Sequence, residues 1–216
     1  NRMLVLLKNH YIAAFFFFII GLILIAPQFL AMHSLGSYNT SGPFLFQSNE
    51  DNYMARIQEI IDGHYLVSSP NFYEYKDTSS FPMLVPIAEY WYAIPVMFFD
   101  MNLSQVMLSN KFLLPFILCW LVYFLILELT IRDSAKNGLS NKWCAILGAV
   151  LVVLGYELVD YRYLLNIIFG SLQNLSMSVW TRPVNPISGA IFLCSFFLII
   201  RKVIGGRRIW ILPGGV

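Results

Sequence analysis

Four long apolar runs alternate with polar segments along this 216-residue chain. They cover about residues 11–32, 105–131, 144–160 and 184–200, and a fifth begins near residue 209. Each of the four is close to the ~20 apolar residues that an α-helix needs to cross a bilayer. The pattern predicts an all-α, polytopic transmembrane helical bundle, and the open fifth run indicates an N-terminal fragment of a longer protein.

The charge pattern gives these runs an orientation. Nine of the 14 Lys and Arg residues flank the same ends of the runs, two before residue 11, three in 132–142 and four in 201–208. The long segment 33–104 instead holds eight acidic and two basic side chains. Because positively charged loops are retained in the cytoplasm, the sequence predicts an inside N-terminus and an extracytoplasmic loop at 33–104.

Residues 48–64 of this outer loop have the spacing of an amphipathic helix. Its apolar positions recur every three or four residues, and they are Tyr53, Met54, Ile57, Ile60 and Ile61. Such a helix is expected to lie on the bilayer or on other helices rather than to cross. Glu50 and Asp51 occupy its first turn, where acids stabilise a helix by about 0.3–1 kcal/mol, so a capping role and a chemical role are both open.

Residues 81–99 are apolar enough to resemble a further span, but they contain three prolines and Glu89. Proline interrupts the hydrogen bonding of a helix. An extra span here would also place the basic loop at 132–142 outside, against the charge pattern. This segment is therefore predicted to be a second juxtamembrane or re-entrant helix in the outer loop.

Composition sets the class of protein. Hydrophobic residues make up 58% of the chain and charged residues 12%, and the mean hydropathy is +0.65, as in a multi-pass membrane protein. The net charge of +2, without a basic run interleaved with aromatic residues, does not indicate nucleic acid as a partner. The three cysteines have no paired spacing, so they predict neither a disulfide framework nor a metal site.

Ionisable side chains cluster in the outer loops and avoid the middle of the predicted spans. A proton- or ion-coupled transporter is expected to place some of them at the membrane midplane. The pattern therefore favours chemistry at the outer membrane surface on a lipid-held substrate. A non-catalytic polytopic membrane protein, either a transporter or an assembly subunit, is the alternative.

Three short motifs resemble the GT-C superfamily of integral membrane glycosyltransferases. Residues 49–63, which begin Asn-Glu-Asp-Asn-Tyr and end Asp-Gly, are similar to the acid, tyrosine, helix and glycine succession of that family's first loop. Phe-Pro-Met-Leu at 81–84, with Trp91, looks like the Pro-Pro-Leu helix of its aminoarabinose and mannosyl transferase branches. Trp-Thr-Arg-Pro-Val-Asn-Pro at 180–186 resembles the Arg-x-x-Asn-Pro element before an inward-running span.

This resemblance implies a reaction and a location. Such enzymes transfer a sugar from a polyprenyl phosphate or pyrophosphate to an acceptor, which is a glycan, a lipid or a protein. The expected setting is a bacterial or archaeal cell membrane, with the active site facing outside and membrane lipid around it.

The resemblance also implies roles for individual residues. Asp51, with Glu50 beside it, is expected to accept the proton of the acceptor; alternatively, the two carboxylates bind Mg²⁺ or Mn²⁺. Arg182 is expected to meet the charge of the leaving phosphate, with snorkelling at the membrane surface as its alternative role. The other expected substrate-binding residues are Arg56, Lys76, Asp77, Tyr53 and His64.

Overall fold

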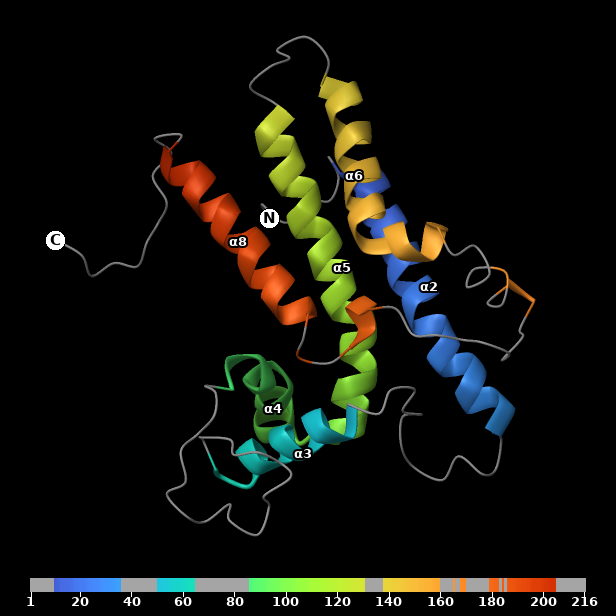
Figure 1. Cartoon of the computed structure of the whole chain (residues 1–216), viewed down its shortest axis with the longest axis vertical. Coiled ribbons are helices and arrows are strands. Elements are labelled where there is room, and N and C mark those ends of the chain that lie inside the picture. Colours follow the sequence, from blue (N-terminus) through green and yellow to red (C-terminus); the bar gives the residue numbers. More distant parts are fainter. Residues whose placement is uncertain are drawn as a thin grey trace, which may run out of the picture.

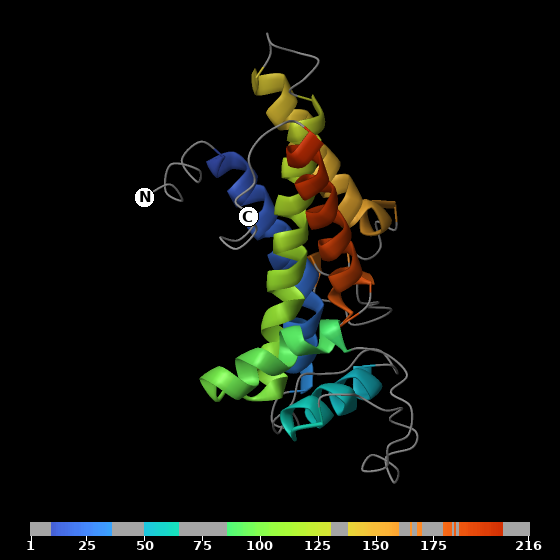
Figure 2. The ribbon, with the colours of Figure 1, turned by 90° about the vertical axis from the view of Figure 1, so that its left-hand side faces the viewer.

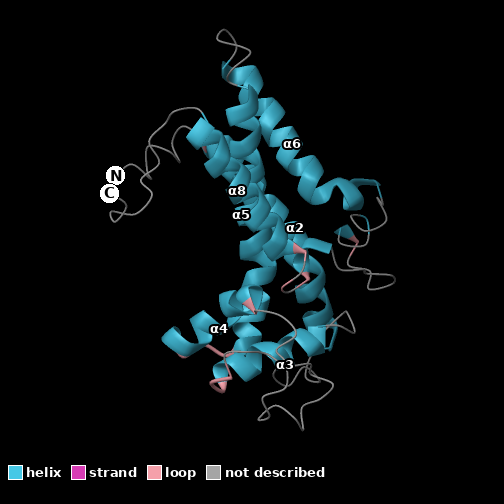
Figure 3. Ribbon diagram, turned by 60° about the vertical axis from the view of Figure 1, so that its left-hand side comes forward, coloured by secondary structure: helices cyan, strands magenta, loops and turns pink. Residues whose placement is uncertain are grey.

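A computed structural model describes residues 10–35, 50–64, 86–130, 138–159, 165, 168–169, 179–182, 184 and 186–204. The regular elements in these residues are all helical, which confirms the all-α prediction for the described part of the chain (Figure 3). In chain order they are α2 (Tyr11–Leu35), α3 (Glu50–Ile61), α4 (Ile87–Phe99), α5 (Leu103–Thr130), α6 (Gly138–Val159), the 3-10 turn η3 (Val179–Thr181) and α8 (Ile187–Ile204).

Three helices in the described residues are long and apolar enough to cross a membrane. These segments are Tyr11–His33 in α2, Leu103–Thr130 in α5 and Ile187–Ile204 in α8. Within α6, which covers most of the predicted third span, the described side chains form the shorter apolar stretch Ser140–Gly155. The chain is therefore described as a membrane protein with three candidate spans.

Helix α5 is the centre of the bundle. It packs against α2, α6 and α8 along its length and against α4 and η3 near its first turns, and Figure 1 shows α8 on one side of it and α2 and α6 on the other. Its buried positions run down one side at helical spacing and include Met107, Leu114, Leu118 and Val122. Because α5 contacts all of these elements, it fixes their relative positions.

Helices α3 and α4 lie across the end of the bundle at which α5 begins (Figures 1 and 2). They pack on each other, and α4 packs on α5. The chain turns from α4 into α5 through Asp100, which adopts a left-handed conformation with φ of 52°, and the Asn102 side chain accepts a hydrogen bond from the Ser104 amide at 2.9 Å. This reversal holds α4 beside the first turns of α5.

The amphipathic pattern predicted for residues 48–64 is confirmed in α3. Ile57 and Ile60 are fully buried, whereas Asp51, Gln58 and Asp62 are exposed. The helix ends at Gly63, whose positive φ of 97° favours glycine. The apolar side of α3 thus faces the protein, and Asp51 and Asp62 point outward.

The packing of α2 on α5 depends on the absence of a side chain at Gly21. A Cβ atom at this position would lie 2.6 Å from the Phe112 ring. That ring is stacked on Phe116 and meets Phe18 edge-on, so it has little room to move away. At Gly155 of α6, a Cβ would meet nothing within 4 Å.

We predict that Gly21→Leu lowers the thermal unfolding midpoint of the detergent-solubilised protein, because overpacking costs about 1–3 kcal/mol. Gly155→Leu is the matched control and should leave the midpoint near that of the wild type or raise it, since leucine favours helix over glycine. Equal midpoints for the two variants would contradict the close contact of α2 with Phe112.

Candidate functional site

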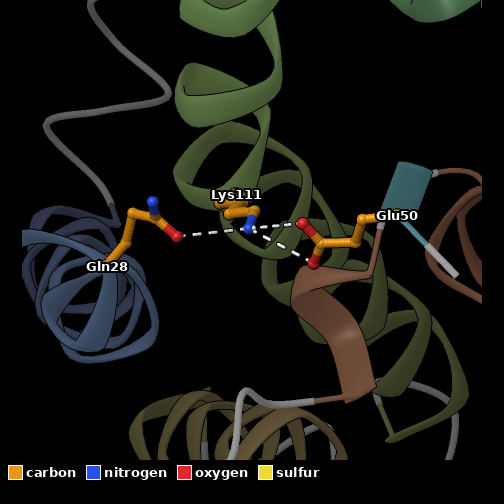
Figure 4. A network of polar contacts seen from close by, with 3 residues as sticks. All are labelled: Gln28, Glu50 and Lys111. Atoms are coloured by element: carbon orange, nitrogen blue, oxygen red, sulfur yellow. Dashed lines mark hydrogen bonds and ion pairs between the residues drawn. The ribbon is translucent and has the colours of Figure 1, made fainter. Parts of the chain in front are cut away.

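A buried ion pair joins the start of α3 to α5. The Lys111 Nζ atom lies 3.1 Å from Oε2 and 3.3 Å from Oε1 of Glu50, and it donates to Oε1 of Gln28 on α2 at 3.3 Å (Figure 4). The side chains of Lys111 and Glu50 are each only 2% exposed. Three helices therefore meet at one ammonium group, whose three donors face three oxygen atoms.

Each member of this group stands on the buried side of its own helix. Glu50 precedes Ile57 by seven residues, or two helical turns, so it points to the same side of α3 as the buried isoleucines. Lys111 lies between the buried Met107 and Leu114 on α5, and Gln28 lies four residues after the fully buried Leu24 on α2. The same helical spacing that builds the core thus brings these polar groups together inside it.

Burial raises the pKa of the Glu50 carboxyl above its ordinary value of 4.5. The charge and hydrogen bond of Lys111 oppose this shift, Asp51 adds to it, and the charge of Arg182 lowers the pKa slightly. Arg182 follows η3 and is exposed. Glu50 and Arg182, from distant parts of the chain, are therefore within electrostatic reach of each other.

The segment that carries Arg182 is held by α4 and α5. Turn η3 packs on α5 and α8, and the Arg182 amide donates to the carbonyl of Val179 at 3.4 Å. Val184 has a positive φ of 68°, which is strained for a β-branched residue. A hydrogen bond links its backbone to the buried phenol of Tyr92 on α4, whose pKa is raised by burial.

The structure separates the two predicted carboxylates. Glu50 is 1% exposed and engaged with Lys111, whereas Asp51 is exposed. Neighbouring residues of a helix do not face each other, so the two side chains diverge from the start of α3. Asp51 is the carboxylate that a molecule outside the protein could reach.

The arrangement fits poorly with a metal ion shared by Glu50 and Asp51. Both oxygens of Glu50 already contact the ammonium of Lys111, which would repel a divalent cation. Within the described residues, no group of three or more His, Cys, Asp or Glu side chains is placed to hold a metal ion. The Mg²⁺ or Mn²⁺ hypothesis stays a prediction.

The remaining predicted site residues have different surroundings. Arg56 forms an ion pair with Glu89 of α4 at 2.7 Å, which ties α3 to α4. Tyr53 is partly buried against the core, and His64 donates its backbone N–H to the carbonyl of Glu59 at 2.9 Å just after α3 ends. The other two predicted residues, Lys76 and Asp77, lie outside the described residues.

Sequence reasoning missed Lys111 and Gln28. A signal was present for Lys111, since a charged residue inside an apolar span marks a candidate functional site and requires a partner. The sequence offered eight acids in the outer loop as partners and no means of choosing Glu50. Gln28 follows a proline in an otherwise apolar run and carried no comparable signal.

Comparisons with known proteins add no assignment, since the chain matches no family model, no curated protein and no solved structure.

We predict that Lys111→Met destabilises the protein at neutral pH by about 3–5 kcal/mol, because it leaves the buried Glu50 carboxylate without a partner. The double variant Lys111→Met with Glu50→Gln should recover much of this loss, since it buries no charge. Unfolding in detergent by denaturant would measure both, with Lys202→Met at the exposed end of α8 as the control. A double variant no more stable than Lys111→Met would contradict the ion pair.

The raised pKa of Glu50 predicts a pH dependence of stability. Between its ordinary value of 4.5 and the higher folded value, the folded state binds a proton that the unfolded state has released. The free energy of unfolding should therefore fall as pH rises through this window. Denaturant titrations at several pH values across the window measure this dependence. The free energy of unfolding should change less with pH in Glu50→Gln than in the wild type, and an equal pH dependence would show that another group is responsible.

Proposed function

We propose that this protein is a membrane glycosyltransferase of the GT-C type, which moves a sugar from a polyprenyl-phosphate-type donor to an acceptor on the extracytoplasmic side. The observation that carries the proposal is that the charge of Arg182 acts on Glu50, which lies next to Asp51 at the start of α3. Transfer of a sugar from a phosphate requires both a carboxylate base and a cation at one site. Two of the three motifs that resemble the superfamily supply these groups.

The distribution of charge supports an outward-facing site. Lys142 lies near the start of α6, and Arg201 and Lys202 lie in the last turn of α8. Those helix ends point away from α3 and α4 (Figure 1). If α2, α5 and α8 cross the membrane with these bases inside, then Asp51 and Arg182 are at the outer surface.

The exposed face of α4 supports contact with lipid at that surface. Ile87, Trp91, Ile94 and Phe98 are all exposed and follow one side of the helix. Trp91 meets Phe192 of the candidate span α8 edge-on, with ring centroids 5.9 Å apart, so this apolar face continues onto the lipid-facing side of the bundle. A lipid-linked donor held in the outer leaflet would therefore lie beside the site.

The proposed reaction assigns separate tasks to Asp51 and Arg182. Asp51 takes the proton of an acceptor hydroxyl or amide, and the freed atom attacks the anomeric carbon of the donor sugar. The bond between that carbon and the phosphate oxygen breaks, and polyprenyl phosphate leaves with its electron pair. Arg182 meets the negative charge that develops on this leaving group.

The ion pairs of α3 define the role of the other charged groups. Arg56 is engaged with Glu89, and Glu50 with Lys111, so these side chains support the position of α3. Lys76 and Asp77 stay proposed substrate-binding residues, together with Tyr53 and His64. The acceptor in this proposal is a glycan, a lipid or a protein.

One observation favours the alternative function of a transporter. Lys111 lies about 12 Å along α5 from Leu103, inside a candidate span, and buried charges in spans often mark ion pathways. A transporter would move its substrate without breaking a bond. Release of polyprenyl phosphate from a donor therefore discriminates between the two functions.

We predict that Asp51→Asn abolishes transfer, since loss of a positioned base costs about 10²–10⁴-fold in rate. Membrane insertion and the unfolding midpoint should be unchanged, because Asp51 is exposed. The assay supplies proteoliposomes with polyprenyl-phosphate mannose or aminoarabinose and a crude envelope extract, and it follows release of polyprenyl phosphate. Asp62→Asn, at an exposed acid that directly follows the same helix, is the matched control, and retained turnover in Asp51→Asn would overturn the assignment.

A further inference from the structure

We infer that Lys111 is a positioning residue, which fixes the first turn of α3 and thereby places Asp51 for the reaction. This inference rests on the proposed function for the role of Asp51. It does not make Lys111 a catalytic residue, because its side chain is 2% exposed and its contacts are to protein oxygens. Its effect on a substrate would therefore pass through α3.

The connections of α3 show why the first turn needs this support. Arg56, in the middle of the helix, ties α3 to α4, and the buried Ile57 and Ile60 lie in its second half. Glu50 is the first residue of the helix, and its contact with Lys111 joins that end to α5. Asp51 is one residue away, so a shift of the Glu50 backbone moves Asp51 with it.

The third contact of Lys111 extends this connection to α2. Gln28 is fully buried, and its Oε1 accepts a hydrogen bond from the ammonium. Lys111, the partner of Glu50, and Gln28, the other partner of Lys111, thus stand on the candidate membrane spans α5 and α2. The position of the first turn of α3 is therefore fixed by α5 and α2 of the bundle as well as by α4.

The ion pair between Lys111 and Glu50 also leaves the Arg182 side chain available to a phosphate. Glu50 feels the charge of Arg182 as well as that of Lys111, and the direct contacts belong to Lys111. A carboxylate already compensated by a buried ammonium attracts a second cation less strongly. Arg182 can then remain exposed, where a phosphate could reach it.

The test compares four variants of the full chain in proteoliposomes. Lys111→Met removes the ion pair with Glu50, and Lys111→Arg keeps the positive charge. The exchange, which combines Lys111→Glu with Glu50→Lys, restores the ion pair with the two charges swapped. In the exchange, the new carboxylate at position 111 can accept from Gln28 Nε2, which has no hydrogen-bond partner among the described residues. Lys202→Met is the control at the far end of the bundle.

Two measurements are made on each variant. The first is the turnover number for release of polyprenyl phosphate. The second is the distance between spin labels at Ala55→Cys on α3 and Leu113→Cys on α5, two exposed positions, with Cys144 and Cys194 replaced by serine. A role confined to stability would lower the unfolding midpoint and leave this distance unchanged in the folded protein.

We expect Lys111→Met to broaden or shift the label distance and to lower turnover by about 10²-fold, the effect of a misplacement of about 1 Å. Lys111→Arg and the exchange should both restore a narrow distance and most of the turnover. An unchanged distance in Lys111→Met, or full turnover with a displaced α3, would overturn the positioning role.

The same data separate this inference from the proposed function. If the wild type releases no polyprenyl phosphate, the proposed transferase and the catalytic role of Asp51 both fall. The label distance in Lys111→Met would then still decide whether Lys111 positions α3. If the wild type is active and the exchange restores the distance without restoring turnover, Glu50 itself acts on the substrate and the positioning role is wrong.

Discussion

The burial of one ammonium group against one carboxylate constrains the arrangement at the end of the bundle that α3 and α4 cover. Removing each ion from water costs several kcal/mol, which only close and well-directed contacts can offset. The Lys111 ammonium therefore requires two oxygen-bearing side chains within hydrogen-bond distance. They are Glu50 at the start of α3 and Gln28 on α2. Helix α3, which also packs on α4, thereby acquires a defined place on the bundle.

That constraint divides two adjacent acids into different tasks. Glu50 points to the protein and pairs with Lys111 there, whereas Asp51 points outward and is exposed. The Arg56–Glu89 pair and the Tyr92–Val184 hydrogen bond extend the same framework to α4 and to the segment of Arg182. In the proposed enzyme, a buried set of polar contacts thus supports an exposed set of reacting groups.

The two crosswise helices present different surfaces. The outer side of α3 is acidic and suits water, and the outer side of α4 is apolar and continues onto α8 through Trp91 and Phe192. A donor with a lipid tail and a charged sugar-phosphate head requires both environments side by side. This pairing supports a lipid-linked substrate more directly than a soluble one.

The sequence by itself determined the helices, the buried side of α3 and the class of membrane protein, because apolar spacing and run length act locally along the chain. It also indicated Asp51 and Arg182 through a resemblance. Only the tertiary structure decided that Lys111 pairs with Glu50, that Gln28 also binds Lys111 and that the charge of Arg182 acts on Glu50. These residues stand on separate elements, and local spacing shows which side of a helix is buried without showing which helix covers it.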